Sequence, residues 1–161
     1  MIFTEAGDMR RLRHAWLPRL MASVAIGLIA APALGIDDPD APDLMAAFEQ
    51  RAASYEARIS QEARTTQDIA QAYGDYQRFL DAELTKAYRE LALKLAPAPR
   101  LRLIQSQRRW LAYRDAGFRF IDDNWTQAQF GTSATLSRGA YRCSIVKGRV
   151  TELIQYIKNY H

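Results

Sequence analysis

The stretch TTQDIAQAYGDYQRFLDAELTKAYRELALKL, residues 65–95, predicts the longest helix of the chain and with it the fold class. Its apolar side chains recur every three or four residues, which is the period of a helix with one buried face. Thr65, with Asp68 three residues later, indicates a capping box at the start of this helix. The members of the stripe are Ile69, Tyr73, Tyr76, Leu80, Leu84, Ala87, Leu91 and Leu95.

Three further segments show the same helical period. Residues 44–59 follow Asp43, a residue type that caps helix N-termini, and residues 100–128 follow two prolines that end the long helix. A last apolar stripe runs from Val146 to Tyr160. The sequence contains no alternating strand pattern. We therefore predict an all-α fold, an antiparallel bundle of about four helices.

The N-terminal region has the pattern of a cleavable secretory signal peptide. Four arginines precede an uncharged run of 17 residues, Leu20–Ile36, and Ala33-Leu34-Gly35 offers the small residues of a cleavage site. The run is shorter than the roughly 20 apolar residues of a membrane-spanning helix, and Pro32 interrupts it. We expect cleavage before Ile36, with a retained membrane anchor as the alternative.

Cleavage at this point would divide the chain into a signal peptide (1–35), an acidic leader (36–43) and a mature helical domain (44–161). We expect the mature protein to be periplasmic or secreted, without a stable membrane anchor. Because an exported protein does not meet nucleic acid, the basic stretch Arg100–Arg109 is not interpreted as a nucleic-acid site.

The mature part offers few groups for catalysis or metal binding. Its single histidine is His161, and its single cysteine is Cys143, which excludes histidine-based catalysis and a zinc site built on cysteine pairs. The adjacent Asp122 and Asp123 would point about 100° apart on a helix, which does not suit two-carboxylate catalysis. We therefore expect no enzyme activity, no cofactor and no metal, and a function in binding.

The two parts of the mature chain carry opposite charge. Residues 36–75 hold nine acidic and three basic side chains, a net charge of −6. Residues 76–161 hold seven acidic and fifteen basic side chains, a net charge of +8. This asymmetry allows two interpretations: the acidic first helix docks on a basic later helix, or an acidic surface attracts a basic partner.

The most specific motif is Gln107-x-x-Trp110-x-x-Tyr113-Arg114-Asp115-Ala116. Together with Leu80–Tyr88, Gly131-Thr132-Ser133 and Cys143-x5-Arg149, it resembles the LprI-like family over about residues 66–156. This is a family of small exported α-helical bacterial proteins named after a lysozyme inhibitor. The resemblance implies a periplasmic or cell-surface location and inhibition of lysozyme.

The chain departs from the family pattern at its cysteines. The resemblance implies one cysteine where Phe118 stands, paired with the one that matches Cys143, and another near Ala72. Without these partners, we expect Cys143 to be a small buried apolar residue. An exposed thiol or an intermolecular bridge is the alternative.

Several polar residues are predicted to form a structural polar core. Gln107, Trp110 and Arg114 share one helical face, and a charge on an inward face needs a partner. We expect Asp81 to pair with Arg114, and Glu83 or Asp115 to pair with Arg149 of the last helix. The alternative interpretation is a ligand site around Trp110.

A partner-binding site is predicted in the segment Gln129–Arg138, which we expect to be an exposed loop between rigid helices. Thr132, Ser133 and Thr135 offer hydroxyl groups, and Arg138 offers a guanidinium that suits carboxylates. A helix-capping loop without a partner is the alternative.

Three functions fit these features. The first is inhibition of a lysozyme-type muramidase by protein binding. The second is immunity against a toxin delivered to the periplasm. The third is a structural or envelope-stress role, or peptidoglycan binding, with no enzyme as target.

Overall fold

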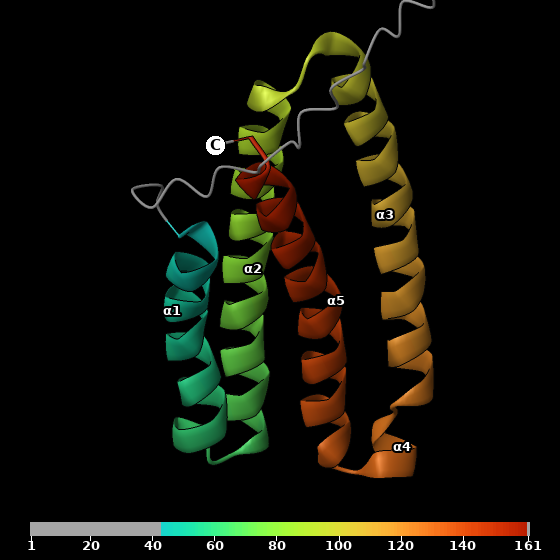
Figure 1. Ribbon diagram of the computed structural model, residues 1–161. Coiled ribbons are helices and arrows are strands. Elements are labelled where there is room, and N and C mark those ends of the chain that lie inside the picture. Colours follow the sequence, from blue (N-terminus) through green and yellow to red (C-terminus); the bar gives the residue numbers. More distant parts are fainter. Residues whose placement is uncertain (1–42, 161) are drawn as a thin grey trace, which may run out of the picture. The chain divides into compact units, whose positions relative to one another are not determined.

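The computed structural model describes residues 43–160 (Figure 1). The expected signal peptide, the acidic leader up to residue 42 and His161 lie outside the described residues. Within residues 43–160 every regular element is helical, which confirms the all-α prediction for this part of the chain. The elements are α1 (Leu44–Ala57), the π-helical turn η1 (Arg58–Glu62), α2 (Thr66–Lys94), α3 (Pro97–Asn124), α4 (Gln127–Phe130) and α5 (Ser133–Lys158).

The predicted caps of the first two helices are confirmed. The Asp43 carboxylate accepts hydrogen bonds from the backbone N–H groups of Met45 (3.0 Å) and Ala46 (2.9 Å). At the start of α2, the Thr65 hydroxyl accepts from the Asp68 N–H at 3.1 Å, and the Asp68 carboxylate accepts from the Thr65 N–H at 2.9 Å. Both caps satisfy N–H groups that a helix start leaves without partners.

The helix α3 begins at Pro97, three residues before the predicted start. Proline is suited to the first turn, where its missing N–H costs no hydrogen bond. The Arg100 guanidinium donates to the Leu95 carbonyl at 2.8 Å and so caps the end of α2. The connection between α2 and α3 is short, and the hydrogen bond from Arg100 of α3 to the carbonyl at the end of α2 fixes it.

The core lies where α1, α2 and α5 meet. The helices α2 and α5 share the most extensive contact, while α1 covers them on one side and α3 packs on α5 (Figure 1). The four long helices alternate in direction along the chain, so α2 and α5 run parallel to each other. Fully buried side chains of large volume are Phe48, Leu80, Val146, Val150, Leu153 and Ile157.

The apolar face predicted for residues 100–128 is less buried than expected. Only Leu103 and Ile121 of α3 are buried, whereas Trp110 and Phe118 are partly exposed. The physical reason is that α3 contacts α5 and does not enter the core between α1 and α2. None of the described helices is long and apolar enough to span a membrane.

Candidate functional site

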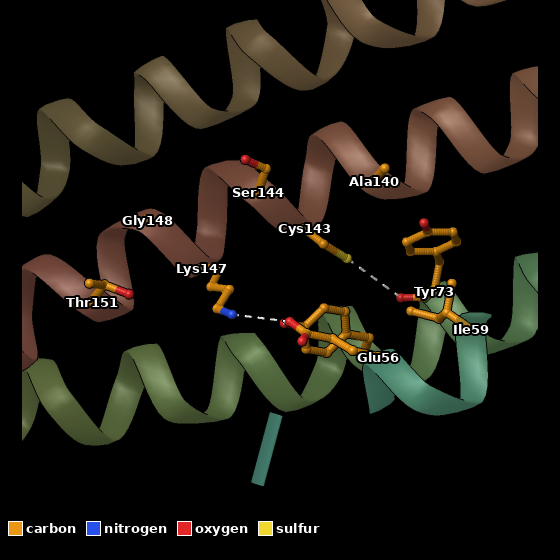
Figure 2. A pocket seen from close by; sticks show the side chains of 10 residues that line it. Glu56, Ile59, Tyr73, Ala140, Cys143, Ser144, Lys147, Gly148 and Thr151 are labelled. Carbon is orange, nitrogen blue, oxygen red and sulfur yellow. Dashed lines mark hydrogen bonds and ion pairs between the residues drawn. The ribbon is translucent and has the colours of Figure 1, made fainter. Parts of the chain in front are cut away.

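A groove of about 560 Å³ lies between α1 with η1, the first half of α2, and α5 (Figure 2). Aromatic side chains from α2 and polar side chains from α1 and α5 form its walls. It is lined by Glu56, Ile59, Tyr73, Tyr76, Ala140, Cys143, Ser144, Lys147, Gly148 and Thr151.

A hydrogen-bonded cluster of charges crosses this groove. The Lys147 ammonium of α5 donates to Glu49 at 2.8 Å and to Glu56 at 3.0 Å, and the Tyr76 hydroxyl donates to Glu56 at 2.6 Å. Figure 2 shows Lys147 reaching from α5 toward Glu56 of α1. The hydrogen bond from Tyr76, followed by Lys147, holds the pKa of Glu56 below its usual value despite burial. The cluster therefore fastens α1 to α2 and α5.

The groove offers little chemistry beyond this cluster. Burial raises the pKa of the Cys143 thiol to about 12, so the reactive thiolate does not form near neutral pH. Cys143 is buried and unpaired, which confirms the prediction of a buried apolar residue. Within residues 43–160, no three histidine, cysteine, aspartate or glutamate side chains gather where they could hold a metal ion.

The opposite charges of the two parts of the mature chain account for only part of the contacts that hold α1 against α2 and α5. Glu49 and Glu56 of α1 do meet a basic residue of a later helix, Lys147. However, α1 also carries Arg51, which pairs with Glu83 of α2 at 2.7 Å. In its ion pairs with α2 and α5, α1 therefore contributes both acidic and basic side chains. The acidic residues of the leader up to residue 42 lie outside the described residues.

Arg149 is the buried centre of a polar cluster, but its partners differ from those predicted. Arg149 is 5% exposed and donates to Gln107 at 3.1 Å, Ser106 at 3.2 Å and Glu152 at 2.7 Å. The prediction of Glu83 or Asp115 as its partner is wrong. Each of these two carboxylates pairs with another arginine, and Glu152 stands one turn from Arg149 on the same helix.

The predicted pair of Asp81 and Arg114 is also wrong. The Arg114 guanidinium donates to its neighbour Asp115 at 2.7 and 2.9 Å. The Asp81 carboxylate makes no hydrogen bond to any described residue; burial raises its pKa, and the charge of Arg114 acts in the opposite direction. Because α3 packs on α5, the two helices that carry Arg114 and Asp81 do not bring them into contact.

Arginines and aromatic rings alternate along the contact between α3 and α5. The guanidinium carbon of Arg149 lies 6.0 Å from the centroid of the Trp110 ring, and that of Arg114 lies 5.7 Å from the same centroid. Phe118 has Arg114 at 5.8 Å and Arg142 at 5.3 Å. Cation–π contacts of this kind stabilise a partly exposed interface. The rings of Trp110 and Phe118 are therefore in contact with the protein's own arginines.

The loop predicted for Gln129–Arg138 does not exist as such. Its first residues belong to α4, only Gly131 and Thr132 are non-helical, and α5 begins at Ser133. Gly131 takes a positive φ of 57°, which glycine adopts without strain and which turns the chain sharply. The small polar residues that resemble a loop thus serve a tight corner between two helices.

The predicted partner-binding residues gather at this corner with differing exposure. Thr132 and Ser133 are exposed, but the Ser133 hydroxyl donates to the Phe130 carbonyl at 2.6 Å. Thr135 and Arg138 are partly buried on the first turns of α5. Within residues 43–160, Arg138 has no hydrogen bond and no ion pair, so its guanidinium is available to a partner.

Four aromatic residues, three of them about half exposed, lie around the same corner, and the sequence does not predict that they gather there. The Trp125 ring lies 5.8 Å from the Phe120 ring and 4.7 Å from the Tyr141 ring. Phe120 is 59% exposed, Phe130 48% and Tyr141 45%. We call Phe120, Trp125, Phe130 and Tyr141 the aromatic corner. Phe120 and Tyr141 fall outside the apolar stripes of the helices predicted for residues 100–128 and 146–160, and this position is the signal that could have indicated exposed aromatic rings.

Comparison with known proteins gives one match. The family model described as Lysozyme inhibitor LprI matches residues 57–153, more than half of the chain. This range includes α2, α3, the aromatic corner and most of α5. No curated protein and no solved structure matches the chain.

Proposed function

This chain belongs to the lysozyme inhibitor LprI family, and from that premise we propose that it is an exported, non-catalytic protein that binds and inhibits a lysozyme-type muramidase. The family match is the observation that carries the proposal. The geometry contributes a contact surface, for which we propose the aromatic corner together with Arg138.

The composition of the corner favours protein binding. Tryptophan, tyrosine and arginine are the residues that contribute most to binding energy at protein interfaces. At this corner, three aromatic rings are about half exposed next to a guanidinium without a partner among the described residues. Burial of these rings against another protein would remove them from water, which is favourable in proportion to the apolar area.

The chemistry of the proposed target suits such a corner. Muramidases depend on two carboxyl groups in a cleft that is open to the substrate. A guanidinium such as that of Arg138 can pair with one carboxylate in a charge-assisted hydrogen bond. The hydroxyls of Thr132 and Thr135 could then take hydrogen-bonding positions that the sugar would otherwise occupy. Inhibition would follow from blocking the cleft.

Lysis of a cell-wall suspension by lysozyme tests this proposal. The variants are Phe120→Ala and Arg138→Ala, with Tyr113→Ala as the control, because Tyr113 is 63% exposed on α3 but lies outside the corner. Truncation of Arg138 should cost about 2–5 kcal/mol of affinity if its partner carboxylate becomes desolvated. The control should inhibit as well as the wild type.

The outcomes separate the surface from the target. Equal inhibition by the wild type and both corner variants would reject the corner as the contact surface. Absence of inhibition by the wild type at micromolar concentration would reject lysozyme as the target. Capture of a toxin from envelope extract, or of muropeptides, would then support the immunity or the peptidoglycan alternative.

Export is the second part of the proposal. The pattern of residues 1–35 supports export with removal of a signal peptide. N-terminal sequencing of protein from a fractionated cell should find Ile36 or a position within a few residues. An intact Met1 or Met9 terminus in the cytoplasm would contradict this.

A further inference from the structure

The end of the molecule where α2 meets α3 exposes large apolar side chains. Leu93, in the last turn of α2, is 81% exposed, and Leu101, in the first turns of α3, is 62% exposed. Both lie beside the short connection that Pro97 and the cap of Arg100 on the Leu95 carbonyl hold in place (Figure 1). We call residues 86–109 the hairpin tip.

The hairpin tip is also strongly basic. Residues 86–109 hold seven basic side chains and a single acidic one, Glu90, a net charge of +6. All seven are exposed, and none of them forms an ion pair with a carboxylate of the described residues. These seven are Lys86, Arg89, Lys94, Arg100, Arg102, Arg108 and Arg109. The tip therefore attracts anions, since seven basic side chains outweigh its one acidic group.

Tyr156 of α5 and Tyr160, two residues beyond the end of α5, stand next to the tip. Tyr156 and Tyr160 are 45% and 50% exposed, and together with Leu91, Leu95 and Leu103 they line a hollow of about 240 Å³. Tyrosine is enriched at membrane–water interfaces, where its ring enters the apolar region and its hydroxyl stays in water. This end of the molecule thus combines exposed leucines, tyrosines and unpaired basic groups.

We propose that the hairpin tip docks reversibly on the surface of an anionic lipid bilayer. Leu93 and Leu101 enter the boundary between headgroups and acyl chains, while the basic side chains approach the lipid phosphates. A bilayer supplies both an apolar phase and a negative surface, and polybasic segments bind such surfaces. A soluble polyanion would satisfy the charges but would leave both leucines in water.

This docking is independent of muramidase inhibition. The hairpin tip lies on residues 86–109 and the aromatic corner on residues 120–141, so the two surfaces use different side chains. Failure of either proposal therefore leaves the other open to its own test.

Co-sedimentation of the mature protein with lipid vesicles tests the proposal. Vesicles of equimolar phosphatidylglycerol and phosphatidylcholine should bind the protein, vesicles of phosphatidylcholine alone should not, and added salt should weaken binding. The double variant L93S/L101S should lose at least about tenfold in binding. Arg102→Gln should lose about fivefold, the effect expected of one basic residue near an anionic surface.

Two control variants separate these effects from general changes in surface chemistry. Tyr113→Ser removes an equally exposed apolar side chain from α3, and Arg119→Gln removes an exposed arginine from its C-terminal half. Both should bind vesicles like the wild type, and all variants should melt at the temperature of the wild type.

Three results would overturn the proposal. The first is equal binding to both kinds of vesicle, and the second is no binding to either. The third is tight binding of soluble polyphosphate by the wild type and by L93S/L101S alike, together with unchanged vesicle binding by L93S/L101S. That result would make the tip a site for soluble polyanions.

Discussion

The ring of Tyr73 occupies the space that a side chain at Gly139 would need. A β-carbon built on Gly139 would lie 2.8 Å from the Tyr73 Cβ and 2.5 Å from its Cδ2, far inside van der Waals contact. The glycine thus lets the tyrosine pack directly against the backbone of α5. This contact lies at one end of the groove and joins the two helices that make up most of the core.

Gly139→Ala should destabilise the protein by about 1–3 kcal/mol, because the added methyl overpacks the contact with Tyr73. Gly148→Ala is the matched control on the same helix, where nothing lies within 4 Å of the added β-carbon. The control should stabilise by about 0.5–1 kcal/mol through helix propensity. Denaturant unfolding measures both, and equal shifts in the same direction would contradict the predicted contact.

The free energy of unfolding should fall at low pH through Glu56. Its pKa in the folded protein lies below the usual 4.5, so its contribution is complete above pH 4.5 and is lost as the pH falls through the lowered value. Glu56→Gln should remove this part of the acid dependence, and Tyr76→Phe should reduce it. Glu62→Gln, at an exposed position of η1, is the control.

At high pH the free energy of unfolding should fall because Lys147 of the same cluster loses its charge. Burial disfavours its charge, but the hydrogen bonds to Glu49 and Glu56 outweigh burial and raise the pKa of Lys147. Its contribution is therefore present below the usual 10.5 and is lost as the pH rises through the raised value. Unfolding curves of Lys147→Met against pH should lack this loss; an unchanged alkaline dependence would exclude Lys147 as its source.

Arg149 and Arg114 should differ in their contribution to stability. Arg149→Ala should cost about 2–3 kcal/mol, because it removes the charge-assisted hydrogen bonds that the buried guanidinium donates to the oxygens of Gln107 and Ser106, while the half-exposed Glu152 regains water. Arg114→Ala should cost about 1 kcal/mol or less, since its partner Asp115 is half exposed. Thermal unfolding with equal losses for both variants would contradict this ranking.

The thiol of Cys143 should react slowly in the folded protein. It is buried, and its raised pKa of about 12 leaves very little thiolate at neutral pH. Ellman's reagent should therefore label it fully only after denaturation, and a non-reducing gel should show no disulfide-linked dimer. Rapid labelling of the native protein would instead favour the exposed-thiol alternative.

Local signals in the sequence predicted much of the fold. Asp43 and Thr65 cap helices through atoms two or three residues away, so the sequence near each cap is sufficient to identify it. The stripe from Tyr76 to Leu91 is buried because one helical face must leave water. The prediction failed at residues 129–138, where small polar residues serve both loops and tight helix corners.

The hydrogen-bond partners of the polar residues were harder to predict from the sequence than the helices. Gln107, Trp110 and Arg149 do come together, but Arg114 and Arg149 form ion pairs with carboxylates on their own helices. The distance between two helices decides whether a charge on one can reach the other, and this distance depends on packing that the helical period does not encode.

The sequence by itself determined the caps that start α1 and α2 and the stripe of α2 that is buried, because hydrogen bonds and side-chain period within a helix are local. Only the tertiary structure decided that Lys147 meets Glu56, 91 positions earlier in the chain, and that the ring of Trp125 lies between Phe120 and Tyr141. Such contacts depend on how helices cross and in which register, and these follow from the packing of the whole core.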